Sequence, residues 1–192
     1  MTETRTEESS ARLSPCRGFF ERVALALPDS KAQFAFWSLT AGGLALDLWT
    51  KEAVFDWLEH GEVFPVISGF FQLVRATNKG AALGMLADRP YLLTAASVAA
   101  LAAIFAVFLF GGSRQKLVLI SLGLFSAGVC GNLYDRIFND GSVRDFIDVY
   151  YRDYHWPAFN VADSLLCIGV GLLIISIFST GKPSQRHARQ HK

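Results

Sequence analysis

The chain has 192 residues, of which 52% are hydrophobic and only 18% are charged. Soluble domains contain about 25% charged residues, so this composition favours a membrane protein over a soluble one. The formal net charge is +1 and there is no basic stripe with interleaved aromatic residues, which argues against a nucleic-acid partner. Cys16, Cys130 and Cys167 share no metal-binding or disulfide spacing, so we expect neither a metal site nor a disulfide framework.

The first 31 residues are rich in Ser, Glu and Arg and are predicted to form a mostly disordered N-terminal tail. Within this tail, residues 19–27 could form a short interfacial helix. The first apolar run begins after the tail, and no small-residue cleavage site follows it before the next polar stretch. We therefore do not expect a cleaved signal peptide.

Four apolar runs follow, at about residues 34–49, 91–110, 117–134 and 161–179. Each approaches the roughly 20 residues that an α-helix needs to cross about 30 Å of hydrocarbon. The runs are apolar on all sides, whereas the helices of a soluble bundle would have polar faces. The sequence predicts an all-α membrane protein in which residues 32–180 form one domain with four transmembrane helices.

Charged residues predict how these spans are oriented. Taken together, the N-terminal tail, the short loop near residue 115 and the C-terminal tail (residues 181–192) contain more basic than acidic residues. Acidic residues outnumber basic ones in segments 51–89 and 135–159. The positive-inside rule therefore places both tails in the cytoplasm and the two longer segments outside.

The outer segment 51–89 alternates short apolar runs, at residues 63–66 and 70–74, with Gly61, Gly69 and Gly80. Such spacing is typical of short strands separated by turns. The predicted extracytoplasmic part is therefore a small β-rich subdomain on the membrane surface, where backbone polar groups can be satisfied outside the hydrocarbon.

Polar residues gather at the outer ends of the predicted spans. An ionisable group at membrane depth is costly and usually faces a cavity or a partner. Several of them at one depth predict a polar pocket between helices, just below the outer interface. The residues concerned are Asp47, Lys51, Asn132, Asp135, Arg136, Asn160 and Asp163.

The composition of this pocket limits its chemistry. The spans contain no histidine, and the chain has neither an HExxH nor a GxSxG motif. These absences argue against a metallopeptidase and against a serine hydrolase. Paired carboxylates remain: the ionised one can take a proton from an attacking water, and the protonated one can polarise a peptide carbonyl. Asp163 is favoured because it lies within a span. Its partner stays open among Asp47, Asp135, Asp145 and Asp148.

Two other classes of protein would also have polar residues between helices. A transporter or channel would line a path across the membrane, whereas here the second and third spans carry no charge. A lipid-binding or assembly protein could share the pocket without needing two carboxylates close together. A presenilin-type protease would carry a GxGD motif, which is absent.

Four sequence blocks occur in order, at residues 47–51, 78–84, 131–148 and 159–164. They are similar to the DQxTK, NxGAAFG, GNLxDR…GxVxDFID and FNxADS blocks of bacterial lipoprotein signal peptidases, the signal peptidase II family. The resemblance extends from about residue 34 to residue 179. It implies an aspartic endopeptidase that removes signal peptides from diacylglyceryl-modified prolipoproteins, cleaving before the lipidated cysteine with an Asp-activated water.

The resemblance also implies the site. It makes Asp145 and Asp163 the catalytic pair, with no metal and no organic cofactor. It assigns substrate binding or shaping of the site to Asp47, Lys51, Asn78, Gly80, Asn132, Arg136 and Asn160. The implied partners are the diacylglyceryl-prolipoprotein substrate, membrane lipids and globomycin-like inhibitors. We expect a monomer in the bacterial cytoplasmic (inner) membrane, with its active site near the extracytoplasmic face.

Some residues depart from the family pattern or have a second interpretation. Leu48 and Leu83 replace a glutamine and a phenylalanine, which affects local packing more than chemistry. Arg144 stands where an apolar residue is common, and it would favour the ionised form of Asp145 if the two side chains approached.

Three further expectations concern charged residues near the pocket. Asp135 is expected to cap or terminate the third helix, with direct catalysis as the alternative. Asp148 is expected to be an exposed loop charge. Arg136 is expected to pair with a carboxylate other than its sequence neighbour.

Overall fold

The computed structural model describes residues 28–80, 89–111 and 115–180. Three predictions concern residues outside these ranges. They are the disordered N-terminal tail with its interfacial helix (residues 1–27), the part of the second sequence block that contains Leu83, and the C-terminal tail.

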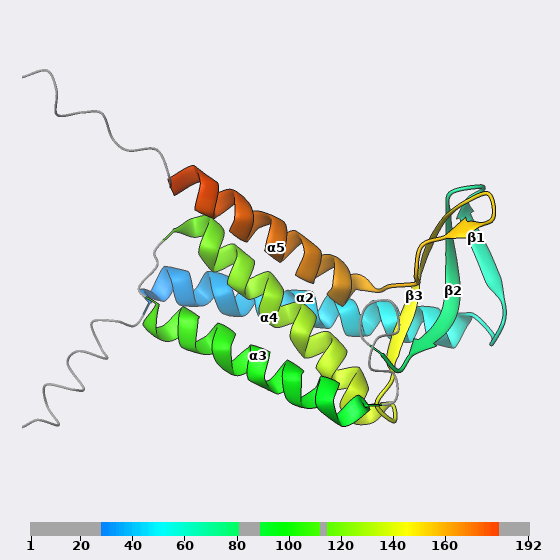
Figure 1. The fold of residues 1–192 in the computed structure, drawn as a ribbon, viewed down its shortest axis with the longest axis horizontal. Helices are drawn as coiled ribbons and strands as arrows, with labels where there is room; N and C mark the ends of the chain where they lie inside the picture. The colour runs from blue at the N-terminus through cyan, green and yellow to red at the C-terminus, as the bar shows by residue number, and fades with distance from the viewer. Residues whose placement is uncertain (1–27, 81–88, 112–114, 181–192) are drawn as a thin grey trace, which may run out of the picture.

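In the part of the chain that the structure describes, four helices run side by side (Figure 1). They are α2 (Ser30–Trp57), α3 (Pro90–Phe110), α4 (Lys116–Phe138) and α5 (Val161–Thr180). Helix α4 packs against each of the other three. Each predicted apolar run lies within one helix, but α2 and α4 continue beyond their runs to Trp57 and Phe138.

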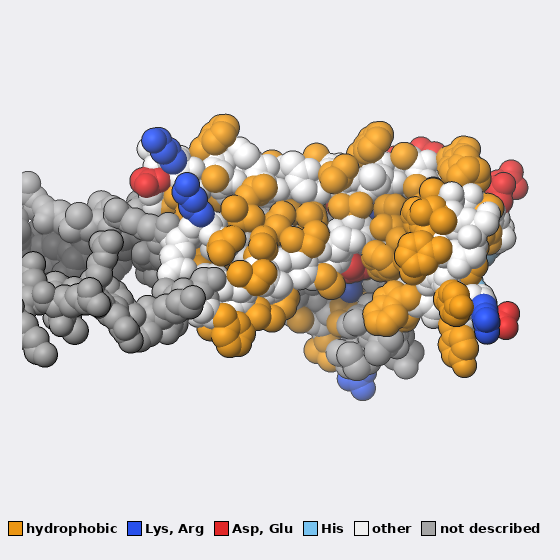
Figure 2. All heavy atoms as spheres, turned by 90° about the horizontal axis from the view of Figure 1, so that it is seen from above, with side chains coloured by type: hydrophobic (Ala, Val, Ile, Leu, Met, Phe, Trp, Pro, Cys, Tyr) orange, Lys and Arg blue, Asp and Glu red, His pale blue; other side chains and the backbone are white. Residues whose placement is uncertain are grey.

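Membrane-length helices are present in the described part of the chain. Three of them, Pro90–Phe110, Lys116–Phe138 and Val161–Phe178, are long and apolar enough to cross a bilayer. Helix α2 is not among them, and its second half carries Asp47, Lys51, Glu52 and Asp56. Figure 2 shows hydrophobic side chains spread over the visible face of the helices. Large exposed apolar side chains on these helices, such as Val98 and Ile177, suit contact with hydrocarbon.

A small antiparallel sheet lies at one end of the bundle, beside the C-terminal end of α2 (Figure 1). Its strands β1 (Val63–Ile67), β2 (Phe71–Asn78), β3 (Val143–Tyr151) and β4 (Tyr154–His155) pair in chain order. Strands β1 and β2 lie where the sequence predicted strands. Strands β3 and β4 lie in segment 135–159, for which no strand was predicted. Strand β3 pairs with β2, which lies about 70 residues earlier in the chain, so this pairing is not visible in the local sequence.

Glycines allow two tight turns next to the strands. Gly69 has a φ of +81° between β1 and β2, and Gly141 has a φ of +78° between α4 and β3. These left-handed conformations favour glycine. Gly141 is also crowded, because a Cβ there would lie 2.7 Å from the Cβ of Pro90.

Two buried clusters hold the helices and the sheet together. Phe36, Phe108 and Leu122 join α2, α3 and α4, and the rings of Phe36 and Phe108 stack with centroids 3.9 Å apart. In the second cluster, Val54 of α2 and Leu58, the residue that follows α2, pack against Phe146 of β3. This second cluster fixes β3 on α2 and so determines where the residue preceding Phe146 lies.

Candidate active site

Two carboxylates meet one asparagine where the sheet joins the bundle. Asp145 lies on β3 and Asp163 in the first turn of α5. The side-chain nitrogen Nδ2 of Asn160 donates to Asp145 Oδ1 at 2.7 Å. The backbone N–H of Asp163 donates to Asn160 Oδ1 at 3.0 Å, and the backbone N–H of Asn160 donates to Asp163 Oδ2 at 3.3 Å. Asn160 therefore bridges the two carboxylates.

A second amide, Asn132 on α4, extends this network. Its Nδ2 donates to Asp163 Oδ1 at 2.8 Å. Its Oδ1 accepts from Asn160 Nδ2 and from Lys51 Nζ, each at 3.2 Å. Because one amide both donates and accepts, Asn132 connects Asp163 to a cation on α2.

A fully buried ion cluster supports the network from α2 and α4. Lys51 Nζ lies 2.7 Å from Asp47 Oδ2 and 3.2 Å from Asp135 Oδ2, and all three side chains have 0% exposure. Asp47 Oδ1 also accepts from the backbone N–H of Ala162 at 2.8 Å, at the start of α5. Buried charges persist where they are paired and hydrogen-bonded. The cluster thus joins α2, α4 and α5 around the candidate site.

Helix α4 can approach Asp47 because residue 131 is glycine. A Cβ at Gly131 would collide with the carboxylate of Asp47 and would lie 3.2 Å from the Cβ of Ala162. A small residue at this position lets the helix backbones come close enough for the ion cluster to form.

The end of β2 brings further predicted residues to the site. Asn78 Oδ1 accepts from the backbone N–H of Gly80 at 2.8 Å, and the Asn78 side chain also hydrogen-bonds Asp145. Arg136 Nη2 donates to the carbonyl of Gly80 at 3.3 Å, and its Nη1 donates to the carbonyl of Asn132 at 3.4 Å. Every residue predicted from the sequence to belong to the site thus joins one connected set of contacts.

The expected ion pair of Arg136 is not found among the described residues. Its guanidinium contacts two backbone carbonyls, and its Nε is buried without a partner in that part of the chain. The neighbouring Asp135 points instead toward Lys51, because adjacent residues of a helix face different sides.

Burial and charge set the protonation of Asp145. Its side chain is only 2% exposed. Burial, and then the negative charge of Asp163, raise the pKa of Asp145 to about 7, although hydrogen bonds from Asn160 and Asn78 and the charge of Lys51 act in the opposite direction. A carboxyl with this pKa can hold a proton near neutral pH beside an ionised partner.

Asp135 lies in the last turn of α4, as expected of a residue near the helix end. Its contacts go further than a cap, because Oδ2 accepts from the backbone N–H of Arg144 at 2.9 Å and Oδ1 from Asn139 Nδ2 at 3.1 Å. With Lys51 as its other partner, Asp135 links α4 to both β3 and α2.

For Arg144, the condition of the sequence-based hypothesis is not met. Its guanidinium pairs with Asp135 and Glu52 and makes no ion pair with Asp145 among the described residues, because successive residues of a strand face opposite sides. The expectation for Asp148 is wrong. Asp148 is not an exposed loop charge: it lies on β3 with 6% exposure. Its Oδ2 accepts from Gln72 Nε2 at 2.6 Å and lies 2.8 Å from His155 Nδ1.

The sequence of this chain is similar to that of known proteins. A family model described as signal peptidase (SPase) II matches residues 39–179. The lipoprotein signal peptidase of Geobacter metallireducens is 42% identical over 143 residues, covering 72% of this chain and 87% of the relative. That of Aquifex aeolicus is 40% identical over 165 residues, covering 82% and 93%.

Solved structures also match. One bacterial membrane enzyme, determined by the in meso method at 2.3 Å resolution, superposes with a TM-score of 0.72 at 29% identity, covering 82% of this chain and 94% of that chain. Another, at 1.9 Å resolution, gives a TM-score of 0.68 at 30% identity, covering 76% and 93%.

Proposed function

The chain belongs to the signal peptidase II family of aspartic peptidases, and from this premise we propose that it cleaves diacylglyceryl-modified prolipoproteins directly before the lipidated cysteine. Membership of this family supports two conclusions about the chain: it removes signal peptides from prolipoproteins, and it is a multi-pass protein of the inner membrane. The contact that carries the finer proposal is the bridge that Asn160 makes between the carboxylates of Asp145 and Asp163, through its side-chain Nδ2 and its backbone N–H.

The two carboxylates take different roles in the proposed reaction. Asp163 accepts hydrogen bonds from Asn132 and from the backbone of Asn160, which suits an ionised group. Asp145 has a pKa of about 7 and suits the protonated group. Asp163 removes a proton from water as the water attacks the peptide carbonyl, and Asp145 donates its proton to the carbonyl oxygen. The tetrahedral intermediate then collapses as its C–N bond breaks: the leaving amine takes a proton from Asp163, and Asp145 recovers its proton from a hydroxyl of the intermediate.

The other site residues support this pair and the substrate. Asp47 and Lys51 hold α5 and Asn132 in place through the buried ion cluster. Asn78, Gly80 and Arg136 border the pair from β2 and α4 and are proposed to contact the substrate backbone. Water is the nucleophile, so the proposed reaction needs neither a metal nor an organic cofactor, and no acyl-enzyme forms.

The membrane supplies part of the substrate positioning. In the proposed arrangement, residues 32–180 form the catalytic domain, α2 is a fourth span and both tails are cytoplasmic. The site lies at the end of the bundle that carries the sheet (Figure 1), which is the extracytoplasmic end in this topology. The lipid chains and the signal helix of the substrate lie in the bilayer, so lateral binding brings the scissile bond to the site with little loss of freedom.

We propose that one copy of the chain suffices for activity. The site draws its residues from α2, α4, α5, β2 and β3 of a single chain, with Gly80 just after β2 and Asn160 just before α5. A globomycin-like cyclic peptide that mimics a bound substrate is proposed to compete for the same site.

The test is cleavage of a diacylglyceryl-modified prolipoprotein by the purified chain, run beside Asp145→Asn and Asp163→Asn. We expect each variant to lose at least about 100-fold in rate, because each removes one proton-transfer group. Asp153→Asn, an exposed aspartate in the turn that follows β3, is the matched control and should keep wild-type activity.

Other outcomes point elsewhere. If only one of the two variants loses activity, the other aspartate is not its catalytic partner, and Asp135 and Asp47 are tested next for that role. No cleavage by a folded wild-type protein would contradict the proposed substrate and favour lipid binding or transport.

A further inference from the structure

The backbone of Arg144 is held on both sides immediately before Asp145. Its N–H donates to Asp135 Oδ2 at 2.9 Å. Its carbonyl accepts from Asn160 Nδ2 at 3.2 Å, and the same Nδ2 donates to Asp145 Oδ1. A shift of residue 144 would therefore alter the contact between Asn160 and Asp145.

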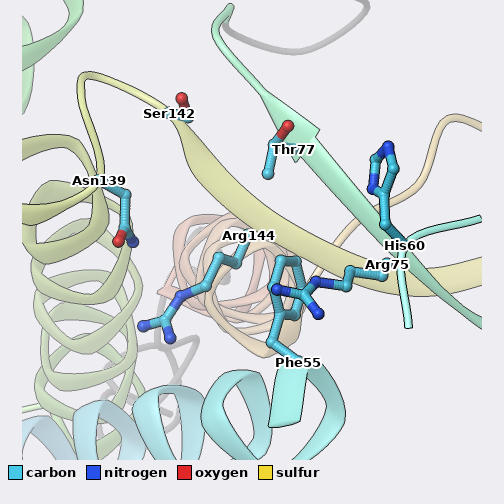
Figure 3. Close-up of a pocket in the computed structure, with 7 residues that line it drawn as sticks. All are labelled: Phe55, His60, Arg75, Thr77, Asn139, Ser142 and Arg144. Atoms are coloured by element: carbon cyan, nitrogen blue, oxygen red, sulfur yellow. The ribbon is translucent and has the colours of Figure 1, made fainter. Parts of the chain in front are cut away.

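The side chain of Arg144 continues this attachment to two helices. Nε and Nη2 donate to Asp135 Oδ1 at 3.1 and 2.9 Å, and Nη1 donates to Glu52 Oε2 at 2.9 Å. Figure 3 shows the guanidinium of Arg144 extending away from β3 toward the helices. Because the guanidinium is planar with donors in fixed directions, it can fix β3 to α4 and to α2 at once.

Arg144 also completes an alternating chain of charges. Asp47, Lys51, Asp135, Arg144 and Glu52 follow one another by direct ion pairs. The first three are fully buried, the Arg144 side chain is 14% exposed, and Glu52 at the outer end is 64% exposed. Arg144 is thus the link by which the buried cluster reaches the strand that carries Asp145.

We propose that Arg144 is a positioning residue: by pairing with Asp135 and Glu52 it holds β3 between α4 and α2 and so keeps the Asp145 carboxyl against Asn160. This inference rests on the proposed function of the same site. Arg144 does not touch the reacting groups through its side chain. Its effect is expected on the rate of the bound substrate more than on substrate binding.

The chain offers a matched control in Arg75. Arg75 lines the same cavity as Arg144 between the sheet and α2 (Figure 3). It donates to the carbonyl of Leu58 at 3.1 Å and lies over the ring of Phe55 at 5.2 Å. It makes no ion pair within the described residues, so Arg75→Gln removes an arginine from the same face without breaking the charge chain.

Four variants of the full chain test the proposal with a diacylglyceryl-modified prolipoprotein. We expect Arg144→Met to lower kcat by up to about 100-fold with a smaller change in KM, because Asp145 loses its alignment. Arg144→Lys keeps the charge and should recover part of kcat. Glu52→Gln breaks an exposed pair, so the protein should fold while kcat falls about twofold to fivefold. Arg75→Gln should match the wild type.

A double variant tests whether Glu52 acts through Arg144. In the Arg144→Met background, Glu52→Gln should cause no further loss of kcat. Equal kcat in wild type, Glu52→Gln and folded Arg144→Met would overturn the inference while leaving the proposed function intact. Losses from Glu52→Gln that add fully to those from Arg144→Met would overturn it as well.

A measurement without substrate separates this inference from the proposed function. Hydrogen exchange of the backbone amides of residues 143–147 should speed up in Glu52→Gln and in Arg144→Met, and not in Arg75→Gln. Unchanged exchange in both variants would overturn the inference even if the wild type failed to cleave the prolipoprotein.

Discussion

Asp145 carries a buried carboxyl whose protonation should control the reaction rate. Its pKa is raised to about 7, chiefly by burial and then by the charge of Asp163. If Asp145 supplies a proton to the substrate carbonyl, the cleavage rate should fall as the pH rises through about 7. The check is a pH–rate profile for kcat with the purified protein. A rate that stays constant from pH 6 to pH 9 would contradict the acid role of Asp145.

The same shift in pKa should make folding depend on pH. The pKa of Asp145 is near 3.8 in the unfolded chain and about 7 in the folded protein, so the folded protein holds the extra proton between these values. Its stabilising effect is complete below about pH 4 and is lost as the pH rises through about 7. Asp145→Asn should therefore unfold at a higher temperature than wild type at pH 8, and at nearly the same temperature at pH 4.

The control for this measurement is Asp153→Asn, whose carboxylate is exposed. Its unfolding temperature should follow that of the wild type at both pH values. If Asp145→Asn unfolds at a lower temperature than the wild type at pH 8, the hydrogen bonds of Asp145 with Asn160 and Asn78 outweigh the cost of burying the Asp145 charge.

Lys51 neutralises two buried carboxylates at once. Its Nζ lies between Asp47 and Asp135, and none of the three side chains is exposed. Lys51→Met leaves Asp47 without a cation and leaves Asp135 paired with Arg144 alone, and removing one partner of a buried pair costs about 3–5 kcal/mol. We expect a clear drop in the unfolding temperature in detergent, compared with Lys79→Met at an exposed position. Equal unfolding temperatures would show that the buried ion cluster contributes little to stability.

At the scale of the elements, the close approach of helix α4 to α2 and α5 decides whether the site can form. A Cβ at Gly131 would collide with the carboxylate of Asp47, whereas a Cβ at Gly171 would meet nothing within 4 Å. Gly131→Ala should destabilise the protein by about 1–3 kcal/mol through overpacking and should lower the cleavage rate. Gly171→Ala lies on α5 and should leave both unchanged. Thermal unfolding and cleavage assays on the two variants provide the comparison.

The sheet is the second element-scale feature, and it unites two segments that lie far apart in the chain. Thr77 of β2 pairs with Arg144 of β3, and Ala76 pairs with Asp145. This register turns Asp145 toward the asparagines and Arg144 toward α2. A shift of one residue would exchange the two side chains between the faces of the strand.

At the scale of the whole molecule, the proposed topology predicts which residues can be reached from outside the cell. In a background without native cysteines, Arg152→Cys lies at the exposed turn after β3 and should react with a membrane-impermeant maleimide in intact cells. A background that keeps only Cys16, in the N-terminal tail, should react only after the membrane is opened. The reverse pattern would invert the proposed orientation.

Much of the candidate site is readable from local sequence. The polar residues at the ends of the apolar runs include Asp47, Lys51, Asn132, Asn160 and Asp163, and the structure brings all five into direct contact. The reason is that helix length and the cost of burying polar groups are local properties of a sequence. The family was likewise identified from its sequence blocks, and the comparisons confirm it. The catalytic roles of Asp145 and Asp163 stay predictions.

Only the tertiary structure decided how segment 135–159 is used. The β-branched and aromatic residues of segment 143–151 favour a strand, but nothing near Asp148 in the sequence reveals that this strand pairs with β2 or that the Asp148 carboxylate accepts from Gln72. The direction of Arg144 depends in the same way on pairing with β2 and on carboxylates supplied by α2 and α4. Strand pairing and ion pairs between distant elements depend on contacts that local sequence does not encode, whereas the spans and the polar positions at their ends depend on composition alone.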